Sequence, residues 1–413
     1  MQTVTGAFRR NPLGVEMVGS KKQETSSNVP STDMQQRLNA TVPHNMPLYL
    51  AAVWQCESTD QADRLLAGEL DGYVYQRDRH PNADLFAEAC QQLHQAERAA
   101  ITSSGMAAIS LAVLSQLQSG DHLLISNQLY GRTTLLLTSE LQRLGIEHSL
   151  VDPYDLPSVR SAVTPQTRMI VVETIANPLL RIVDIRGLAE IAHAADALLL
   201  VDNTFATPAI CKPLTLGADL VMESVSKFMN GHGDVMLGML AGREEHWARV
   251  EMVNAAWGFA SSPLECWLAC RGISTLTLRM QQASATAQAA AELLAGREEV
   301  ESVQYPGLED HIDYALAREQ FVNGFGHMVT FRLAGGRAAA DKVIASGEIP
   351  FCPSLGDVST TLSHPTSTSH RGLSEQQRVA LGITEGMIRL SVGVDPTVNV
   401  LSHLEKALDQ AAE

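Results

Sequence analysis

The chain has 413 residues, of which 45% are hydrophobic and 18% are charged, an ordinary composition for a globular protein. This length exceeds what one hydrophobic core usually serves, so it predicts two domains, or one large domain and a smaller one. The formal net charge of -16 argues against nucleic acid as a partner, because the phosphates would repel the chain.

The sequence contains no apolar run of membrane-spanning length and no secretory signal with a hydrophobic centre. We therefore expect a cytoplasmic protein with no membrane partner. The cysteines form no C-x-x-C pair, which favours reduced thiols over a disulfide framework or a zinc site. Cys266 and Cys270 lie one helical turn apart in an apolar stretch, which indicates core packing.

The predicted elements begin after a polar first segment. Residues 1–45 have no helical or strand period and predict a flexible N-terminal arm. Apolar runs predict strands at 99–102, 122–126, 168–174, 197–205, 218–224 and 235–242. Helical spacing predicts helices at 83–97, 103–117, 133–145 and 185–196. Continuous apolar strands separated by helices are typical of a mostly parallel α/β sheet covered on both faces, so we expect a large domain over 46–275.

The pattern changes near residue 275. A long helix at 276–296 is followed by a strand at 327–335, a helix at 336–346, a strand at 387–395 and a helix at 398–412. This succession predicts a smaller α+β domain over 276–413.

One lysine stands in an unusual setting. In the stretch ESVSKFMNGHGDVMLG, Lys227 alternates with Ser224 and Ser226 and precedes a glycine-rich run. A surface lysine needs no such setting, whereas a lysine that binds an aldehyde cofactor does. An amine becomes a nucleophile when it is desolvated or placed near positive charge.

Other polar residues follow predicted strands, where ligands of open parallel sheets bind. Gly105 and Met106 follow Ser104 at a helix start, where free backbone N–H groups bind phosphate. Ser-Gly at a helix start is also an ordinary cap, and Asp202 at the end of a strand is also an ordinary turn residue. Together with Lys227 and the aromatic ring of Tyr130, however, these residues describe a pocket for pyridoxal 5'-phosphate (PLP), with Asp202 facing the protonated ring nitrogen.

The sequence resembles the Cys/Met-metabolism PLP enzymes, the family of cystathionine γ-synthase, cystathionine γ-lyase, methionine γ-lyase and O-acetylhomoserine sulfhydrylase. The resemblance covers residues 43–410. Matching stretches occur in family order: GYVYQRDRHPN, SSGMAAI, LYGRT, VETIANP, VDNTFATP, SVSKFMNGHGDVMLG, SLGDVSTTLSHPTSTSH and IRLSVGVD. The resemblance implies the fold type I architecture of aspartate aminotransferase.

The resemblance also implies roles for individual residues. It implies that Lys227 carries the cofactor as an imine and shuttles protons, and that Tyr130 stacks on the cofactor ring as a second catalytic residue. Arg389 is the implied ligand of the substrate α-carboxylate, with Ser354 beside it. The remaining implied cofactor contacts are Asp202 at the ring nitrogen, Asn177 at the ring hydroxyl, Gly105, Met106, Ser224 and Ser226 at the phosphate, and Tyr75 and Arg77 reaching that phosphate from a neighbouring subunit. A shared site of this kind implies at least a homodimer, and a homotetramer is the usual state of the family.

The implied reaction is γ-elimination or γ-replacement on a sulfur-containing or O-acylated amino acid. Members that handle cystathionine usually carry a glutamate where this chain has Pro353, which counts against cystathionine. Arg132 stands where the family usually has Gly or Cys, and we expect it to meet an anionic group on the distal end of the substrate. A solvent-facing or inter-subunit arginine is the alternative at that position.

Three other interpretations fit less well. A non-catalytic scaffold with this fold would not need Lys227, Asp202, Tyr130 and Arg389 together. A nicotinamide dehydrogenase is disfavoured because no G-x-G-x-x-G follows an early strand. A metal site is not expected, because His232, His364 and His370 follow no standard zinc spacing.

Overall fold

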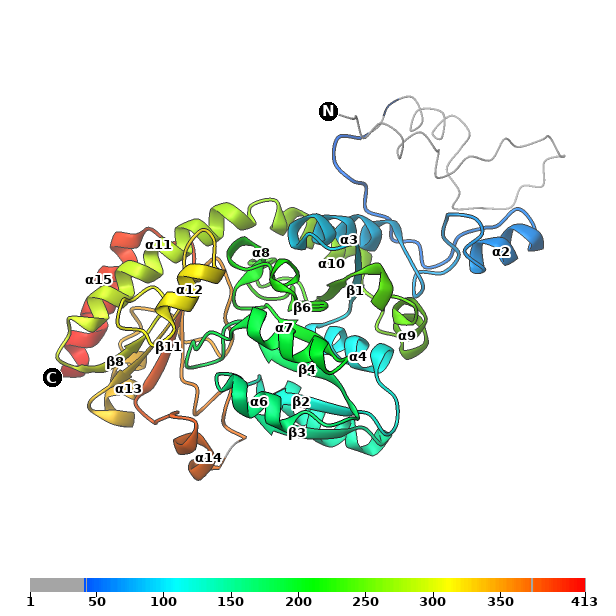
Figure 1. Cartoon of the computed structure of the whole chain (residues 1–413). Helices are drawn as coiled ribbons and strands as arrows, with labels where there is room; N and C mark the ends of the chain where they lie inside the picture. Colours follow the sequence, from blue (N-terminus) through cyan, green and yellow to red (C-terminus); the bar gives the residue numbers. More distant parts are fainter. Residues whose placement is uncertain (1–40, 42, 373, 413) are drawn as a thin grey trace. The chain divides into compact units, whose positions relative to one another are not determined.

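The computed structural model describes residues 41, 43–372 and 374–412, so the predicted N-terminal arm lies almost wholly outside the described residues. Leu48–Glu413 forms one compact unit that contains two β-sheets (Figure 1). The predicted division of this part of the chain at residue 275 stays a prediction. It falls between the last strand of one sheet and the first strand of the other.

The larger sheet has seven strands. In spatial order they are β1 (Arg98–Thr102), β7 (Gly238–Gly242), β6 (Leu220–Ser224), β5 (Leu198–Asp202), β4 (Thr167–Glu173), β2 (His122–Ser126) and β3 (Glu147–Val151). The strands β6, β5, β4, β2 and β3 are each parallel to the next in this order. Strand β7 is antiparallel to both of its neighbours, β1 and β6. The predicted mostly parallel α/β sheet is therefore confirmed.

Helices cover both faces of this sheet (Figure 1). They are α3 (Pro81–His94) and α7 (Ile185–Ala194) on one face, and α4 (Gly105–Gln116) and α9 (Val250–Trp257) on the other. Along β2, Leu124 packs in the core of the first face, whereas Leu123 and Ile125 pack in the core of the second. Burial on both faces explains why the strands read as continuous apolar runs rather than as alternating ones.

The smaller sheet has four antiparallel strands. Their spatial order is β10 (Thr361–Ser363), β11 (Met387–Ser391), β9 (Met328–Leu333) and β8 (Val300–Gln304). The helices α11 (Leu276–Ala295) and α13 (Gly336–Ala345) pack against it, and α15 (Thr397–Ala412) packs against these two helices. Phe331 of β9 and Leu390 of β11 belong to the same hydrophobic core as one face of the larger sheet, which joins the two sheets.

The other helices are mostly short. They are α2 (Thr59–Leu66), α5 (Gly131–Leu135), α6 (Leu156–Ala162), α8 (Thr207–Ile210), α10 (Pro263–Ile273), α12 (Tyr314–Gln320) and α14 (Glu375–Ala380). The helix predicted over 133–145 is wrong as a single element, because α5 passes into a π-helical turn and then a 3₁₀ turn. Strand β3 was not predicted, because this edge strand is largely exposed and lacks an apolar run.

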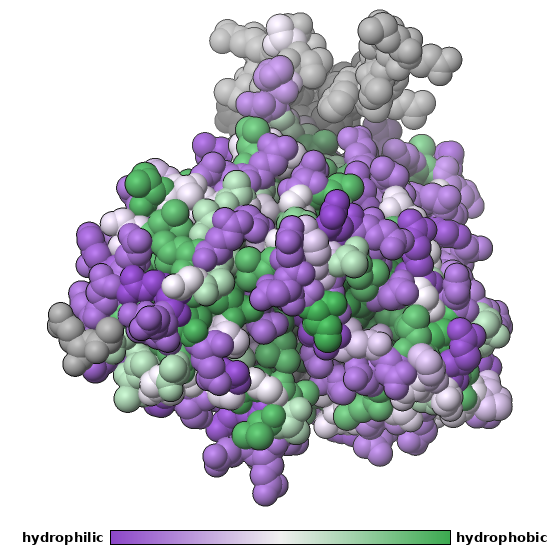
Figure 2. Space-filling model, turned by 60° about the vertical axis from the view of Figure 1, so that its left-hand side comes forward, coloured by the Kyte–Doolittle hydropathy of each residue, from purple (hydrophilic) through white to green (hydrophobic). Residues whose placement is uncertain are grey.

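Within the part of the chain that the structure describes, no helix combines the length and apolar character that a membrane span requires. On the face drawn in Figure 2, hydrophilic residues dominate the surface, and hydrophobic residues gather in smaller separate patches. This distribution agrees with the acidic composition of the chain.

Candidate active site

The carboxyl ends of neighbouring parallel strands meet at one edge of the larger sheet. Strand β4 ends at Glu173, β5 at Asp202 and β6 at Ser224, and Glu173 and Asp202 are direct partners in the parallel ladder. Strand β1 runs in the same direction as β6, because both are antiparallel to β7. The start of α4, which follows β1, therefore reaches the same edge. This edge is the place where open parallel sheets bind ligands.

The start of α4 forms an anion-binding corner against β6. The Ser104 hydroxyl caps the helix by accepting a hydrogen bond from the Ala107 N–H at 3.1 Å. The amides of Gly105 and Met106 have no hydrogen-bond acceptor among the described residues, as expected for the first turn of a helix. A Cβ on Gly105 would lie 2.8 Å from the Ser224 Cβ, so only glycine permits this close approach. The two free amides and the helix dipole favour a phosphate here.

Lys227 lies three residues beyond the end of β6. Its Nζ donates a hydrogen bond to the Ser354 hydroxyl at 3.0 Å. Burial, and after it the positive charge of Arg389, lowers the pKa of the Lys227 amine below its ordinary value. Gly356 allows the Ser354 segment to approach, since its φ is +82° and a Cβ there would lie 2.6 Å from the Phe228 nitrogen.

Two buried carboxyl groups lie behind the edge. The Asp202 carboxylate accepts a hydrogen bond from the Thr204 N–H at 3.0 Å, and burial raises the pKa of Asp202. Burial also raises the pKa of Glu173, and the neighbouring Asp202 raises it further. Ionisation of one of these carboxyl groups therefore disfavours ionisation of the other. A cation placed beside Asp202 would favour its ionised form.

Glu173 also fixes two loops, a role that sequence reasoning missed. Its Oε1 accepts from the Tyr130 N–H at 2.6 Å and its Oε2 accepts from the Asn177 N–H at 3.3 Å. The signal was present in the sequence, because Glu173 is an acidic residue at the end of a buried apolar strand.

Arg389 is a buried cation without an acidic partner. It is 2% exposed on β11, and burial lowers the pKa of its guanidinium to about 10. Its Nε donates to the Ser363 hydroxyl at 3.1 Å and its Nη1 donates to the Asn177 Oδ1 at 2.6 Å. Among the described residues no carboxylate pairs with it. Because an unpaired buried charge is costly, this site is suited to a carboxylate supplied by a ligand.

The aromatic and basic residues predicted around the site are more exposed. Tyr130 is 41% exposed just before α5, and Arg132 lies exposed within α5. Arg77 donates from Nη1 to the Ala255 carbonyl at 2.9 Å, and Tyr75 is 44% exposed. Among the described residues no hydrogen bond or ion pair joins Tyr75 or Arg77 to Lys227.

A second residue that sequence reasoning missed supports the turn after Lys227. The buried guanidinium of Arg279 donates to the Phe228 carbonyl at 2.6 Å and to the Met229 carbonyl at 3.0 Å. The Phe228 ring stacks on His327 with the ring centroids 4.3 Å apart. No sequence signal identified Arg279, because its partners are backbone groups about 50 residues earlier.

In the described ranges, no three His, Cys, Asp or Glu side chains are placed so that they could hold a metal ion. The three histidines considered for a metal lie in separate protein contacts: His232 with the Asn230 carbonyl, His364 with Ser367 and Glu385, and His370 with Ser369. All six cysteines are free thiols.

A model of the family described as Cys/Met metabolism PLP-dependent enzyme matches residues 29–409. The chain belongs to this family. Its cofactor is therefore PLP, and it is a PLP-dependent lyase or transferase, as the sequence predicted. The predicted class of reaction, PLP-dependent γ-elimination or γ-replacement in sulfur amino-acid metabolism, is confirmed at that level.

Similar members of the family carry several activities. An L-methionine γ-lyase of Porphyromonas gingivalis is 38% identical, with 88% of this chain and 92% of the relative covered. An O-succinylhomoserine sulfhydrylase of Pseudomonas aeruginosa is 39% identical, with 90% and 93% covered. A crystal structure of cystathionine γ-synthase from Xanthomonas oryzae pv. oryzae is 34% identical, with a TM-score of 0.84 and with 89% and 93% covered. This structural likeness confirms the predicted fold type.

The strand-end residues of this family member fit PLP. The free amides of Gly105 and Met106 suit its phosphate, and the Lys227 amine, whose pKa is lowered, suits its aldehyde. The buried Asp202 carboxylate suits a protonated ring nitrogen. All three groups belong to the edge formed by β1, β5 and β6. The exact contact of each residue with PLP stays a prediction.

The buried His327 yields a prediction about acid stability. Its ring is fully buried, and burial lowers its pKa to about 3, below the ordinary value of 6.5. The folded protein therefore excludes a proton that the unfolded chain binds below pH 6.5. The neutral His327 therefore makes its full contribution to the free energy of unfolding above pH 6.5, and this contribution is lost as the pH falls toward 3. His327→Phe should reduce the loss of unfolding free energy between pH 6.5 and 4.5 by about 2 kcal/mol.

Urea unfolding of both proteins at the two pH values measures this difference. Phe is chosen because it can keep the stacking on Phe228. Equal losses in the native protein and in the variant would contradict the prediction.

Proposed function

We propose that this enzyme acts at Cγ of a sulfur-containing or O-acylated amino acid, by elimination or by exchange of the leaving group for a thiol. One observation carries the proposal: Arg389, a buried cation with no carboxylate partner in the described part of the chain, lies close enough to Lys227 for its charge to lower the Lys227 pKa. An amino acid offers both groups that this pair would bind, an amine and an α-carboxylate. The named relatives include γ-lyases, a sulfhydrylase and a γ-synthase.

We assign the binding of the substrate to Arg389 and Ser354. The fork of Arg389, held by Ser363 and Asn177, would accept the α-carboxylate. The Ser354 hydroxyl, which now accepts from Lys227 Nζ, would turn to the same carboxylate once Lys227 is engaged elsewhere. Binding of the α-carboxylate to Arg389 and Ser354 would orient Cα toward Lys227.

Lys227 would hold PLP and afterwards move protons. Bound PLP withdraws electrons from the substrate Cα, which makes its proton acidic. Since burial and Arg389 lower the Lys227 pKa, a larger fraction of the amine is neutral and can accept the proton from Cα. Once the amine has released that proton, it can accept one from Cβ. Removal of both protons permits a group on Cγ to leave.

We assign the other cofactor contacts as the sequence predicted. Asp202 would hold the ring nitrogen, Tyr130 would stack on the ring, and the Asn177 amide, whose oxygen is bound to Arg389, would donate to the ring hydroxyl. Ser224, Gly105 and Met106 would hold the phosphate. Ser226 requires a rearrangement for this role, because its hydroxyl now donates to the Leu237 carbonyl at 3.2 Å.

A substrate panel tests the proposed reaction. Methionine, cystathionine, cysteine, O-acetylhomoserine and O-succinylhomoserine are each offered with and without added thiol. We expect a product from at least one substrate that has a leaving group on Cγ. Release of 2-oxobutyrate without thiol marks a lyase, and product only with thiol marks a transferase. Turnover of cysteine alone would contradict action at Cγ.

Lys227→Ala is the control of this panel. It should abolish both turnover and the absorbance band of bound PLP that borohydride removes. A variant that retained the native band and turnover would show that another group binds the cofactor.

We further propose that Arg132 selects substrates whose distal end is anionic. Its guanidinium is exposed on α5, two residues after Tyr130, and no acidic partner holds it among the described residues. Arg132→Ala should lower kcat/KM for O-succinylhomoserine about 10- to 100-fold, which corresponds to one charge-assisted hydrogen bond, and should leave O-acetylhomoserine and methionine within about twofold.

Arg143→Ala is a matched control, because Arg143 is an exposed arginine that contacts Glu140 on the same segment of chain. An equal loss on every substrate after Arg132→Ala would remove the proposed role.

We propose that two copies of the chain complete each site, in a homodimer or a homotetramer. Several exposed apolar side chains fit a surface covered by another subunit: Leu50, Val53, Tyr75, Met236, Trp257 and Leu264. Tyr75 and Arg77 would reach the phosphate of the second copy. The free thiols of the chain fit a reducing, cytoplasmic location, which we also propose.

Subunit complementation tests the shared site. Arg77→Ala and Lys227→Ala should each lose activity as pure proteins. In a mixed dimer one site would combine native Lys227 from one copy with native Arg77 from the other, so activity should return to about half of the native value. Mixed dimers without activity would place Arg77 in its own subunit's site or outside the site.

A further inference from the structure

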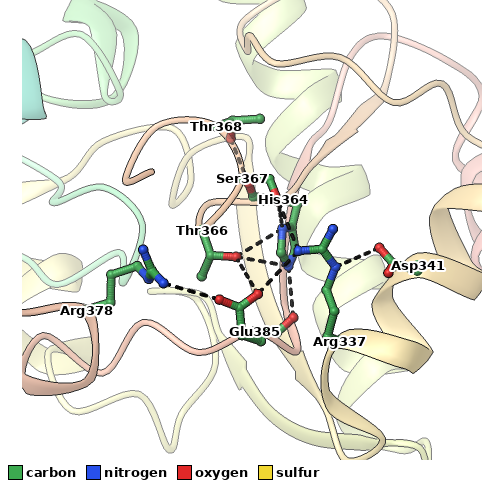
Figure 3. Close-up of polar contacts among 8 residues, drawn as sticks. All are labelled: Arg337, Asp341, His364, Thr366, Ser367, Thr368, Arg378 and Glu385. Atoms are coloured by element: carbon green, nitrogen blue, oxygen red, sulfur yellow. Dashed lines mark hydrogen bonds and ion pairs between the residues drawn. The ribbon is translucent and has the colours of Figure 1, made fainter. Parts of the chain in front are cut away.

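A polar cluster lies at the edge of the smaller sheet, apart from the residues assigned to the reaction (Figure 3). We call it the Glu385 cluster. It consists of Arg337, Asp341, His364, Thr366, Ser367, Arg378 and Glu385. The Glu385 carboxylate lies at its centre in Figure 3 and accepts hydrogen bonds from three elements that are separate in the sequence.

The contacts of Glu385 join two helices to one loop. Its Oε2 accepts from Arg337 of α13 at 3.3 Å and from the Thr366 hydroxyl at 3.1 Å, and its Oε1 accepts from Arg378 of α14 at 3.4 Å. Asp341 holds Arg337 through a 2.8 Å contact one helical turn away. The carboxylate therefore connects the Thr366 loop to the helices α13 and α14 through their arginines.

Backbone groups continue the same connection. The His364 Nε2 lies 2.8 Å from the Glu385 carbonyl oxygen, which accepts from the protonated form of that nitrogen. The Thr368 hydroxyl donates to the His364 carbonyl at 2.7 Å, and the His370 N–H donates to the Pro365 carbonyl at 2.9 Å. Residues 363–370 are thereby folded into one compact turn, which we call the carboxylate-side segment.

The carboxylate-side segment touches the substrate site at both ends. At its start, the Ser363 hydroxyl accepts from Arg389 Nε at 3.1 Å. At its end, His370 lies against Arg389 and the Asn177 backbone, and the Ser369 carbonyl lies 3.7 Å from the Cβ position of Gly131. Its middle residue, Thr366, is bound to Glu385. The segment therefore connects the Glu385 cluster to the guanidinium that we assign to the substrate carboxylate.

We propose that Glu385 and Thr366 are positioning residues, which hold the carboxylate-side segment against Arg389 and thereby set the affinity for the α-carboxylate of an amino acid. This inference rests on the assignment of Arg389 under the proposed function. Glu385 and its arginines are partly exposed, so their ion pairs add little to overall stability. Their effect is local, because Arg389 has no acidic partner among the described residues and depends on Ser363 and Asn177 for its orientation.

Two ligands of the PLP-loaded enzyme, which differ only in the α-carboxylate, show how much that group contributes to binding. L-norleucine has an α-carboxylate and no leaving group on Cγ, and n-pentylamine is the same molecule without the carboxylate. Each is titrated against the absorbance of the bound cofactor, which reports binding without turnover. The ratio of the two dissociation constants measures what the α-carboxylate contributes.

We expect Glu385→Gln to weaken the binding of L-norleucine about tenfold and the binding of n-pentylamine less than about twofold. One amide oxygen cannot accept hydrogen bonds from both guanidinium groups as the carboxylate does, and small displacements of a bidentate clamp are costly. Thr366→Val keeps the ion pairs and removes the hydroxyl that joins the segment to Glu385 and contacts the His364 ring, so it should weaken the binding of L-norleucine about threefold. Hydrogen exchange of the amides in residues 363–370 should become faster in both variants. Glu301→Gln, which breaks an exposed pair with Arg332 in the same sheet, should change none of these quantities.

Arg389→Lys separates this proposal from the function on which it rests. If it leaves the ratio of the two dissociation constants unchanged, the assignment of Arg389 to the carboxylate is wrong, and the positioning role falls with it. If it changes the ratio while Glu385→Gln and Thr366→Val do not, only the positioning role is wrong. An equal weakening of both ligands in Glu385→Gln and Thr366→Val would show a purely structural role and would also overturn the proposal. Should Glu385→Gln fail to fold, Thr366→Val decides the question alone.

Discussion

The parallel hydrogen-bonded ladder of β2, β4, β5 and β6 brings the carboxyl ends of these strands to one edge of the larger sheet. Parallel strands must be joined by crossovers, and in this chain the crossovers place helices on both faces. The faces are thereby used for the core, and the edge remains for polar groups. The parallel pairing thus explains why Glu173, Asp202 and Lys227 all lie at this edge.

Burial of charge gives the edge its chemistry. Burial raises the pKa values of Asp202 and Glu173 and lowers those of Lys227 and Arg389, so in each of these groups burial disfavours the charged form. Structural ion pairs would relieve such charges. Among the residues that the structure describes, Arg389 has only neutral hydrogen-bond partners, and Lys227 has only a hydroxyl. A cofactor and an amino acid together bring the complementary charges.

The second sheet supplies Arg389, to which we assign the substrate carboxylate. Arg389 of β11 reaches across to Asn177, which follows β4 in the larger sheet, with a contact of 2.6 Å. Ser363, at the end of β10, holds the same guanidinium. The orientation of Arg389 thus depends on how the smaller sheet and its loops pack, and the Glu385 cluster, which shares His364, Thr366 and Ser367 with the carboxylate-side segment, is part of that packing.

Much of the fold and the main chemical groups were predictable from sequence. Continuous apolar runs identify buried strands because both faces of the sheet are covered, and the residues that follow these runs include Lys227, Asp202 and Tyr130. The half-exposed β3 and the interrupted helix after Arg132 were missed or wrongly drawn. Neither has a strong apolar period, and local backbone turns decide their shape.

The sequence by itself determined the family, the cofactor and the position of Lys227 after a buried strand, because these depend on residue types at local spacings. Only the tertiary structure showed that Glu173 binds the loops of Tyr130 and Asn177, that Arg279 supports the turn after Lys227, and that Glu385 joins two helices to the carboxylate-side segment. These contacts join residues that are mostly distant along the chain, often through backbone groups. Backbone amides and carbonyls are the same in every residue, so no pattern of side chains announces which of them will meet.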